Sequence, residues 1–252
     1  HEVVAGTANP VDEARRRILA HHSSPEQAGR VFAEASRRLA VFRHIILAGD
    51  SRSFPSAHAF LAGAAADGDI HVYTGTDAGA AFGRAADRDR CAAILVELGE
   101  ECLGVHTGEA RGTEGSNVLG FARFRMGSAD PTNLIELVRQ PQTTVQALAA
   151  SKALFESFGF KVAVCSDVPG RIVNRLIRPY LNAALRRLDE RLASANDMDA
   201  TLKMGLGYPE GPIALLERTG LAAHFDVTQA LHEWTGDQAF APARRARVAK
   251  VR

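Results

Sequence analysis

The most regular pattern of apolar and polar positions in this chain follows the Pro169-Gly170 turn signal and continues to Leu192. At about 100° per residue, the apolar side chains fall into one broad band and polar side chains share the opposite face. The band contains Ile172, Val173, Leu176, Ile177, Tyr180, Leu181, Ala184, Leu185, Leu188 and Leu192, and the opposite face contains Arg171, Arg175, Arg178, Asn182 and Arg186. Because the band covers more than half of the circumference, it predicts a long helix that buries a second side against another helix or another subunit, with Leu185 pointing outward.

Helical spacing continues beyond this helix, and no alternating run interrupts it. The further segments are Asp197–Met204, Pro212–Arg218 and Ala222–Trp234. They predict an all-helical C-terminal domain over residues 167–252.

The first half of the chain instead contains short apolar runs, separated by segments rich in Ala, Gly and Asp. The runs are His44–Ala48, Ile70–Tyr73, Ala92–Val96 and Leu119–Phe124, and a short strand at Val3–Ala5 and helices at Val11–His22 and Ser24–Ala40 precede them. Alternating strands and helices predict a Rossmann-like α/β domain with a mainly parallel sheet over residues 1–166.

Composition is that of a soluble globular protein, because 46% of the 252 residues are hydrophobic and 23% are charged. The net charge of +1 gives no reason to expect nucleic acid as a partner. No apolar run approaches the length of a membrane span, and the opening His1–Gly6 lacks the basic start and apolar core of a signal peptide. Three cysteines without CxxC spacing argue against a disulfide framework and a zinc site, so we expect a cytoplasmic protein without a metal.

Two strand-to-helix turns in the first half are candidate sites for a dinucleotide. The turn near the N-terminus contains only Gly6, so the G-x-G-x-x-G pattern that lets a pyrophosphate approach a helix N-terminus is absent there. A second turn carries Gly75 and Gly79, and Glu97 ends the next apolar run, where a ribose-binding acid could lie. The G-x-x-x-G spacing of this turn also fits an ordinary tight connection, and the sequence leaves both interpretations open.

Asn174 is an unusual polar residue on the apolar side of the predicted long helix, where a buried amide needs hydrogen-bond partners. It could be a structural amide that ties down the preceding turn, or a residue of a functional site. The surrounding segment, Asp-Val-Pro-Gly-Arg-Ile-Val-Asn-Arg-Leu over 167–176, is followed by Leu-Gly-Tyr-Pro-Glu-Gly-Pro over 206–212. Together these segments resemble the C-terminal domain of the L-3-hydroxyacyl-CoA dehydrogenases, and a looser likeness reaches back to Leu134.

The resemblance implies hydride transfer from the C3 carbon of a 3-hydroxyacyl-CoA to NAD, with a histidine as general base and a glutamate that orients it. Glu136, in the run Leu-Ile-Glu-Leu-Val, matches the glutamate, and Asn174 matches an active-site asparagine. The histidine position corresponds to Phe124 or, with another alignment of the preceding glycine, to Ala122. Neither side chain can accept a proton, so Glu136 could instead be an idle surface carboxylate or the strand-end partner of an arginine.

The nearest histidine is His106, which we expect at the end of a short strand over Leu103–Thr107. It could be a displaced base oriented by Glu136, or a structural or solvent-facing histidine. Two further departures from the family pattern, Arg171 and Glu210, add charge near the acyl-binding face that the resemblance implies.

Two functions therefore compete. The first is a dehydrogenase that oxidises a 3-hydroxyacyl-CoA, or a related 3-hydroxy acid, with NAD. The second is a non-catalytic homodimeric relative that binds acyl-CoA or a protein partner through its helical domain. A third possibility is that another chain supplies the missing base and cofactor loop.

Overall fold

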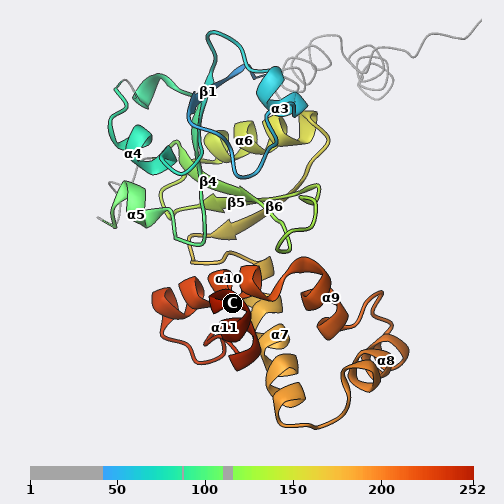
Figure 1. Ribbon diagram of the computed structural model, residues 1–252. Helices are drawn as coiled ribbons and strands as arrows, with labels where there is room; N and C mark the ends of the chain where they lie inside the picture. Colours follow the sequence, from blue (N-terminus) through green and yellow to red (C-terminus); the bar gives the residue numbers. More distant parts are fainter. Residues whose placement is uncertain (1–41, 87, 110–115) are drawn as a thin grey trace, which may run out of the picture. The chain divides into compact units, whose positions relative to one another are not determined.

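A computed structural model describes residues 42–86, 88–109 and 116–252. Within these ranges, six strands form one sheet in the order of the chain (Figure 1). The strands are β1 (His44–Ala48), β2 (Ile70–Thr74), β3 (Ala93–Glu97), β4 (Val118–Arg123), β5 (Leu134–Arg139) and β6 (Lys161–Ser166). Neighbours pair in parallel except for β4 and β5, which are antiparallel. The strand and helices expected before residue 42 lie outside the described residues.

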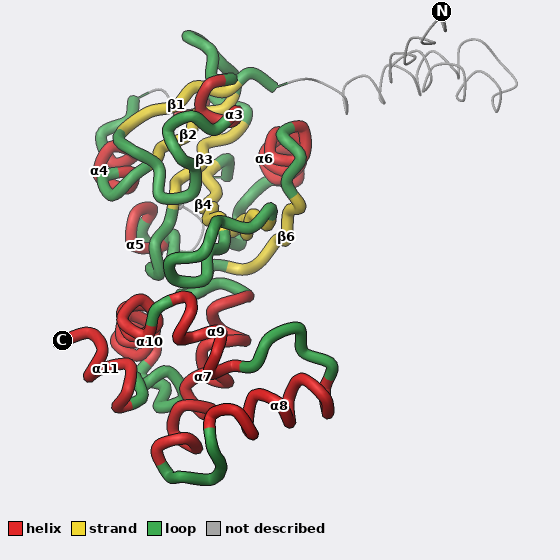
Figure 2. The backbone as a smooth tube through the Cα atoms, turned by 45° about the vertical axis from the view of Figure 1, so that its right-hand side comes forward, coloured by secondary structure: helices red, strands yellow, loops and turns green. Residues whose placement is uncertain are grey.

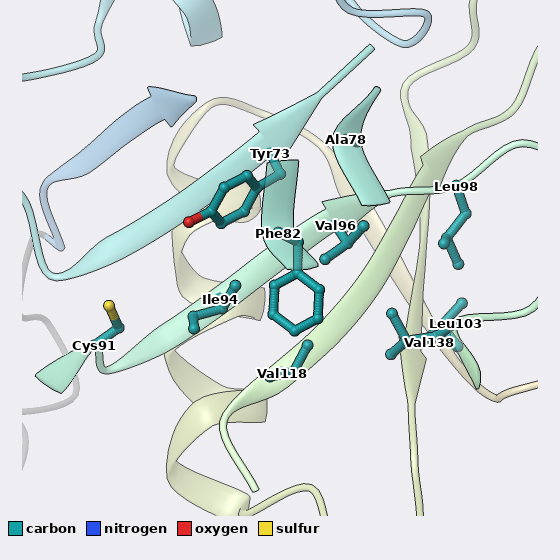
Figure 3. Close-up of a cluster of buried hydrophobic side chains, with 10 residues drawn as sticks. All are labelled: Tyr73, Ala78, Phe82, Cys91, Ile94, Val96, Leu98, Leu103, Val118 and Val138. Atoms are coloured by element: carbon teal, nitrogen blue, oxygen red, sulfur yellow. The ribbon is translucent and has the colours of Figure 1, made fainter. Parts of the chain in front are cut away.

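Four of the strands coincide with the apolar runs in the sequence, because central parallel strands are buried on both faces and so read as continuous apolar stretches. All five residues of β3 are buried. Helices α4 (Ala78–Gly83) and α5 (Gly104–Thr107) cover one face of the sheet, and α6 (Val145–Ser157) covers the other (Figure 2). Figure 3 shows Phe82 of α4 directed at Ile94, Val96 and Val118 of the sheet.

The other face of the sheet is packed with aromatic rings. Helix α3 (Ala59–Ala62) contributes Phe60, whose ring stacks on that of Phe155 from α6 with centroids 5.4 Å apart. Phe121 of β4 meets Phe155 at 5.3 Å, and His44 of β1 stacks on Phe60 at 4.6 Å. The two faces together make the α/β layer Rossmann-like, as predicted.

From residue 167 onward, the structure consists of helices and turns, which confirms the predicted all-helical C-terminal region. The helices are α7 (Val173–Asp189), α8 (Ala195–Leu206), α9 (Pro212–Thr219), α10 (Leu221–Thr235) and α11 (Arg244–Val251). Ser194 caps α8 through a hydrogen bond from the Asp197 N–H, and Pro212 opens α9. Helix α11, rich in arginine, was not predicted.

Helix α7 buries two sides, but the second is its polar face and not, as the sequence had predicted, part of the apolar band. Leu181 and Leu185 lie in the helical core, while Arg178 and Asn182 on the polar side are also buried. The second side faces α10, because Arg178 and Asn182 both hydrogen bond to His224 of that helix. The outward position predicted for Leu185 is wrong, because its side chain is 1% exposed and the partner of its face comes from the same chain.

The boundary between residues 166 and 167 stays a prediction. The last strand ends at Ser166 and α7 begins at Val173, yet several contacts join the two regions. Met126, from the loop after β4, lies in the helical core, and the Ser128 N–H donates to the carbonyl of Thr219 at 2.9 Å. These contacts pack the loop after β4 against the helical core and the end of α9.

Candidate functional site

The start of helix α7 is held by a carboxylate from the sheet. Oε1 of Glu136, in β5, accepts hydrogen bonds from the backbone N–H groups of Ile172 and Val173, each at 2.8 Å. The first N–H groups of a helix have no partner within it, and they form the positive end of the helix dipole. Oε2 of Glu136 accepts from Nε of Arg171 at 3.4 Å. The Glu136 side chain is 1% exposed, so the surface-carboxylate interpretation is wrong and the arginine partner is confirmed.

Arg171 reaches this position from an unusual backbone conformation. Its φ of 52° lies in the left-handed region, which is unfavourable for a residue with a Cβ. The guanidinium donates to the carbonyl of Gly99 at 2.6 Å and lies 4.0 Å from a carboxylate oxygen of Glu100. These contacts with Gly99, Glu100 and Glu136 hold the strained turn in place.

The residue opposite Glu136 across the sheet is Ala122. The antiparallel register makes these two residues direct Cα partners, and such partners have Cβ atoms about 4.5–5.5 Å apart. Phe124 lies beyond the end of β4 and packs against the helical core. A methyl group and the Arg171 guanidinium therefore border the Glu136 carboxylate, and neither can act as a base.

Both ends of the Asn174 amide are engaged. Nδ2 donates to Oε2 of Glu100 at 2.9 Å, and Oδ1 accepts from Nε of Arg178 at 3.0 Å. The amide therefore ties α7 to the loop after β3 and to the next turn of its own helix. These contacts fit a structural amide, and they also lie where the loop after β3 meets α7, as a residue of a functional site would. Both roles of Asn174 therefore stay predictions.

The hydrogen bonds continue from Asn174 into the helical core. Nη1 of Arg178 donates to Nδ1 of His224 at 2.9 Å, and the other ring nitrogen of His224 lies 3.0 Å from Oδ1 of Asn182. Burial, together with the Arg178 charge, lowers the pKa of His224 to about 3. Burial also lowers the pKa of Arg178 to about 10. A neutral imidazole thus connects a buried cation to a buried amide.

The glycine-rich turn and Glu97 meet, as their places in the sequence suggested, but they bind each other. The Gly75 N–H, directly after β2, donates to Oε2 of Glu97 at 2.6 Å. The Ser53 N–H and the Ser51 hydroxyl donate to Oε1 at 2.6 and 2.9 Å. A cavity of about 550 Å³ borders this edge and is lined in part by Asp50 and Ser51. The Glu97 carboxylate is therefore committed to the surrounding turns.

His106 lies in a helix rather than a strand, so the predicted strand over Leu103–Thr107 is wrong. The carboxylate of Asp167 accepts from the N–H groups of Leu103 and Gly104 at 2.6 and 2.8 Å, and so caps helix α5. Five residues with an alternating pattern are too few to distinguish a strand from such a turn of helix.

The carboxylate partner of His106 is Glu101, not Glu136. Nε2 of His106 lies 3.4 Å from Oε1 of Glu101, and a Cβ added to Gly79 would lie 1.9 Å from Nδ1. The ring therefore packs directly on the glycine-rich turn, which explains Gly79 as a packing residue. Burial raises the pKa of Glu101, but hydrogen bonds from His106 and the Gly99 N–H outweigh it and lower the pKa to about 2.

Residues 97–101, which we call the acidic loop, contact the glycine-rich turn, the start of α7 and helix α5. Glu97 holds the glycine-rich turn, Glu100 holds Asn174, and Glu101 holds His106. Sequence reasoning noted only Glu97. The signal for the others was present, because Glu-Leu-Gly-Glu-Glu follows a buried strand directly, at the edge where parallel sheets usually bind ligands.

Comparison with known proteins identifies the helical part. A family model described as 3-hydroxyacyl-CoA dehydrogenase, C-terminal domain, matches residues 170–250. These residues belong to the 3-hydroxyacyl-CoA dehydrogenase family. A 3-hydroxybutyryl-CoA dehydrogenase of Bradyrhizobium diazoefficiens is 36% identical over 109 residues, which are 43% of this chain and 37% of the relative. The mitochondrial hydroxyacyl-coenzyme A dehydrogenase of Sus scrofa is 38% identical over 100 residues, 40% of this chain and 32% of the relative.

The matched stretch thus spans about a third of the length of these relatives. Among solved structures, the 3-hydroxybutyryl-CoA dehydrogenase of Escherichia coli has a TM-score of 0.60 and 21% identity, over 94% of this chain and 47% of that chain. The (S)-3-hydroxybutyryl-CoA dehydrogenase of Ralstonia eutropha has a TM-score of 0.58 and 24% identity, over 72% of this chain and 64% of that chain. At these identities the structures show a common fold.

Within the matched region, Gly211 is required by a close approach between α8 and the start of α9. The Asp199 carboxylate of α8 accepts from the N–H groups of Ile213 and Ala214, the first turn of α9. A Cβ added to Gly211 would lie 2.2 Å from Cγ of Asp199, so only glycine lets the carboxylate approach. Asp199 and Gly211 form one structural unit.

Two kinds of feature are absent from the described residues, 42–86, 88–109 and 116–252. No helix in those ranges is long and apolar enough to cross a membrane. Nor do the described His, Cys, Asp and Glu side chains form a group of three or more that could hold a metal ion.

Proposed function

We propose that this protein is a member of the 3-hydroxyacyl-CoA dehydrogenase family that binds an acyl-CoA-type ligand and has little or no dehydrogenase activity of its own. The observation that carries the proposal is the environment of Glu136. Its carboxylate accepts two helix N–H groups and the Arg171 guanidinium, and its cross-strand neighbour is Ala122. A dehydrogenase of this family would need an imidazole there.

The size of the expected defect follows from the missing base. A positioned general base contributes on the order of 10²–10⁴-fold in rate. Neither Ala122 nor the engaged Glu136 can take a hydroxyl proton, and the amide of Asn174 is occupied by Glu100 and Arg178. Turnover of simple 3-hydroxyacyl-CoA substrates should therefore be weak or undetectable.

The test combines binding with turnover. Calorimetry should detect binding of acetoacetyl-CoA, while its reduction by NADH should be slower than about 10⁻² s⁻¹, against typical enzyme values of roughly 1–10³ s⁻¹. A matched pair of variants, Ala122→His and Phe124→His, each with Arg171→Leu, tests the two alignments of the base. Wild-type turnover above about 1 s⁻¹ would contradict the proposal, and so would a failure to bind the acyl-CoA.

The second candidate is an active NAD-dependent dehydrogenase. The presence of Glu136 and Asn174 favours it, and so does a histidine paired with a carboxylate, His106 with Glu101. Titration with NAD separates the candidates, because a dehydrogenase must bind its cofactor before hydride transfer. If turnover is found, His106→Ala should abolish it and leave acyl-CoA binding unchanged, whereas turnover that survives this change would exclude His106 as the base.

A cytoplasmic homodimer formed through the helical region is part of the proposal. Several large apolar side chains of α7, α8 and the segments after them are exposed: Leu176, Leu192, Met204, Leu206 and Tyr208. Helix α8 has no fully buried residue. An exposed apolar surface of this kind is typical of a protein interface.

A further inference from the structure

Three hydrogen-bond donors converge on one carboxylate at the carboxyl ends of β1, β2 and β3. The Ser53 N–H and the Gly75 N–H each lie 2.6 Å from an oxygen of Glu97, and the Ser51 hydroxyl lies 2.9 Å from it. Glu97 is the last residue of β3 and is 1% exposed. Its side chain is therefore a buried anion held by two main-chain amides from two different turns.

These turns are fixed by contacts of their own. The Thr74 hydroxyl donates to the carbonyl of Gly49 at 2.7 Å, and Nη1 of Arg123 donates to the carbonyl of Ser53 at 3.3 Å. A Cβ on Gly75 would lie 2.8 Å from the carbonyl oxygen of Asp50, so the two turns are in direct contact. The amides cannot be redirected to a second acceptor without breaking these contacts.

In parallel α/β sheets, this carboxyl edge is where nucleotides bind, and main-chain N–H groups of its turns receive their phosphates. We infer that Glu97 closes this edge to phosphate: the chain supplies its own anion to the amides that a dinucleotide would use. A phosphate placed there would touch the carboxylate, and like charges at that distance repel. The nearby Arg52 is already used, since it donates to the Glu97 carbonyl at 3.2 Å and pairs with Glu101 at 4.0 Å.

The residues at this edge therefore do not fit the NAD that the family implies. The mismatch is separate from the missing base at Glu136, since it concerns binding of phosphate and not proton transfer. The two proposals can fail separately. Turnover of a 3-hydroxyacyl-CoA would contradict the proposed function, but this inference would still hold if pyrophosphate did not bind at Ser53 and Gly75.

The test opens the edge by removing the carboxylate. Inorganic pyrophosphate and NAD are titrated calorimetrically into the wild type, Glu97→Ala and a matched control, Asp50→Ala. Asp50 is exposed beside the same edge, so its removal takes away one negative charge and leaves the Glu97 contacts intact. Glu97→Ala should bind pyrophosphate at least about tenfold more tightly than the wild type, whereas Asp50→Ala should not differ from it.

A folded Glu97→Ala with wild-type affinity for pyrophosphate would overturn the inference, and so would an equal gain in Asp50→Ala. If Glu97→Ala does not fold, the wild type decides the question by itself. Its amide NMR signals for Ser53 and Gly75 should not move on addition of pyrophosphate or NAD. Saturable shifts at both amides would show that the edge accepts phosphate with Glu97 present.

Discussion

Mild acid should destabilise this protein, because His224 is buried as a neutral imidazole. Arginine has only donors, so Nδ1 of His224, at 2.9 Å from Arg178, must accept and carries no proton. The other ring nitrogen then donates to Oδ1 of Asn182. The direction of that amide is fixed, since its Nδ2 donates to the carbonyls of Ala239 and Ala241. Protonation at Nδ1 would place two donors against each other in a site that is 1% exposed.

The magnitude follows from the two pKa values. Burial and Arg178 lower the pKa of His224 from 6.5 to about 3 in the folded protein. Between these two pKa values the unfolded chain binds more protons than the folded protein. The contribution of His224 to stability is therefore fully present above pH 6.5 and is lost as the pH falls toward 3. The free energy of unfolding should drop by about 2 kcal/mol between pH 7 and pH 5 from this residue alone. The low pKa of Glu101, about 2, makes its stabilisation fade only as the pH falls from 4.5 toward 2, below this window.

Urea unfolding followed by circular dichroism at pH 5, 6 and 7 measures this effect. His224→Gln keeps one acceptor and one donor but does not titrate, so its curve should lose about 2 kcal/mol less than the wild type over the same range. Thr228→Val is the matched control. It removes the hydrogen bond from the Thr228 hydroxyl to the His224 carbonyl, at 2.8 Å, without touching the ring. This variant should be less stable at every pH and keep the wild-type pH dependence.

Parallel curves for the wild type and His224→Gln would refute the reasoning. They would mean that His224 takes up a proton equally in the folded and unfolded states. The arrangement of donors and acceptors among Arg178, His224 and Asn182 would then be wrong.

Three further changes test other parts of the structure. Leu176→Asp, at a side chain that is 73% exposed, should convert the proposed dimer to monomers by light scattering with an unchanged far-ultraviolet spectrum; a wild type that is already monomeric would count against the dimer. Arg171→Met leaves the buried Glu136 carboxylate without a cation and should cost about 2–4 kcal/mol in urea unfolding, with part of the loss recovered by adding Glu136→Gln. Asp199→Ala removes the acceptor of two N–H groups at the start of α9 and should cost about 1–2 kcal/mol by thermal unfolding. Gly211→Ala should destabilise the wild type, and most of that loss should disappear only when Asp199→Gly is added, because the added methyl would otherwise lie 2.3 Å from Cβ of Asp199.

The first four strands of the sheet could be predicted, because burial of a parallel strand on both faces gives a continuous apolar run in the sequence, whereas β6 was not predicted. The His44–Ala48 run coincides with β1, and the others agree within two residues. Helix α5 could not be predicted, because its first N–H groups are capped by Asp167, which lies far along the chain. Helix α6 carries small and apolar residues on all of its faces, so it lacks the contrast that revealed α7.

In the candidate site, too, some contacts could be predicted from the sequence and others could not. Glu97 and Gly75 could be expected to meet, because Glu97 ends β3, Gly75 follows β2, and these two parallel strands end at one edge of the sheet. The pairing of Glu100 with Asn174 joins residues 74 positions apart, and no local pattern encodes it. The polar face of α7 gave a wrong expectation of exposure, because Arg178 is as buried as a core leucine. Its side chain is buried only because Asn174 and His224 accept its hydrogen bonds, and that requires α10 to be in place.

Under the proposed function, the absence of an imidazole at Ala122 and the presence of Arg171 belong to one electrostatic arrangement around Glu136. A buried carboxylate without a partner is strongly unfavourable, so Glu136 could not remain beside Ala122 unless another group compensated its charge. The two helix N–H groups supply part of that compensation, and Arg171 supplies the rest. A histidine introduced at Ala122 alone would compete with Arg171 for the same oxygen. Restoring a base therefore requires both positions to change, which is why the test variants pair Ala122→His with Arg171→Leu.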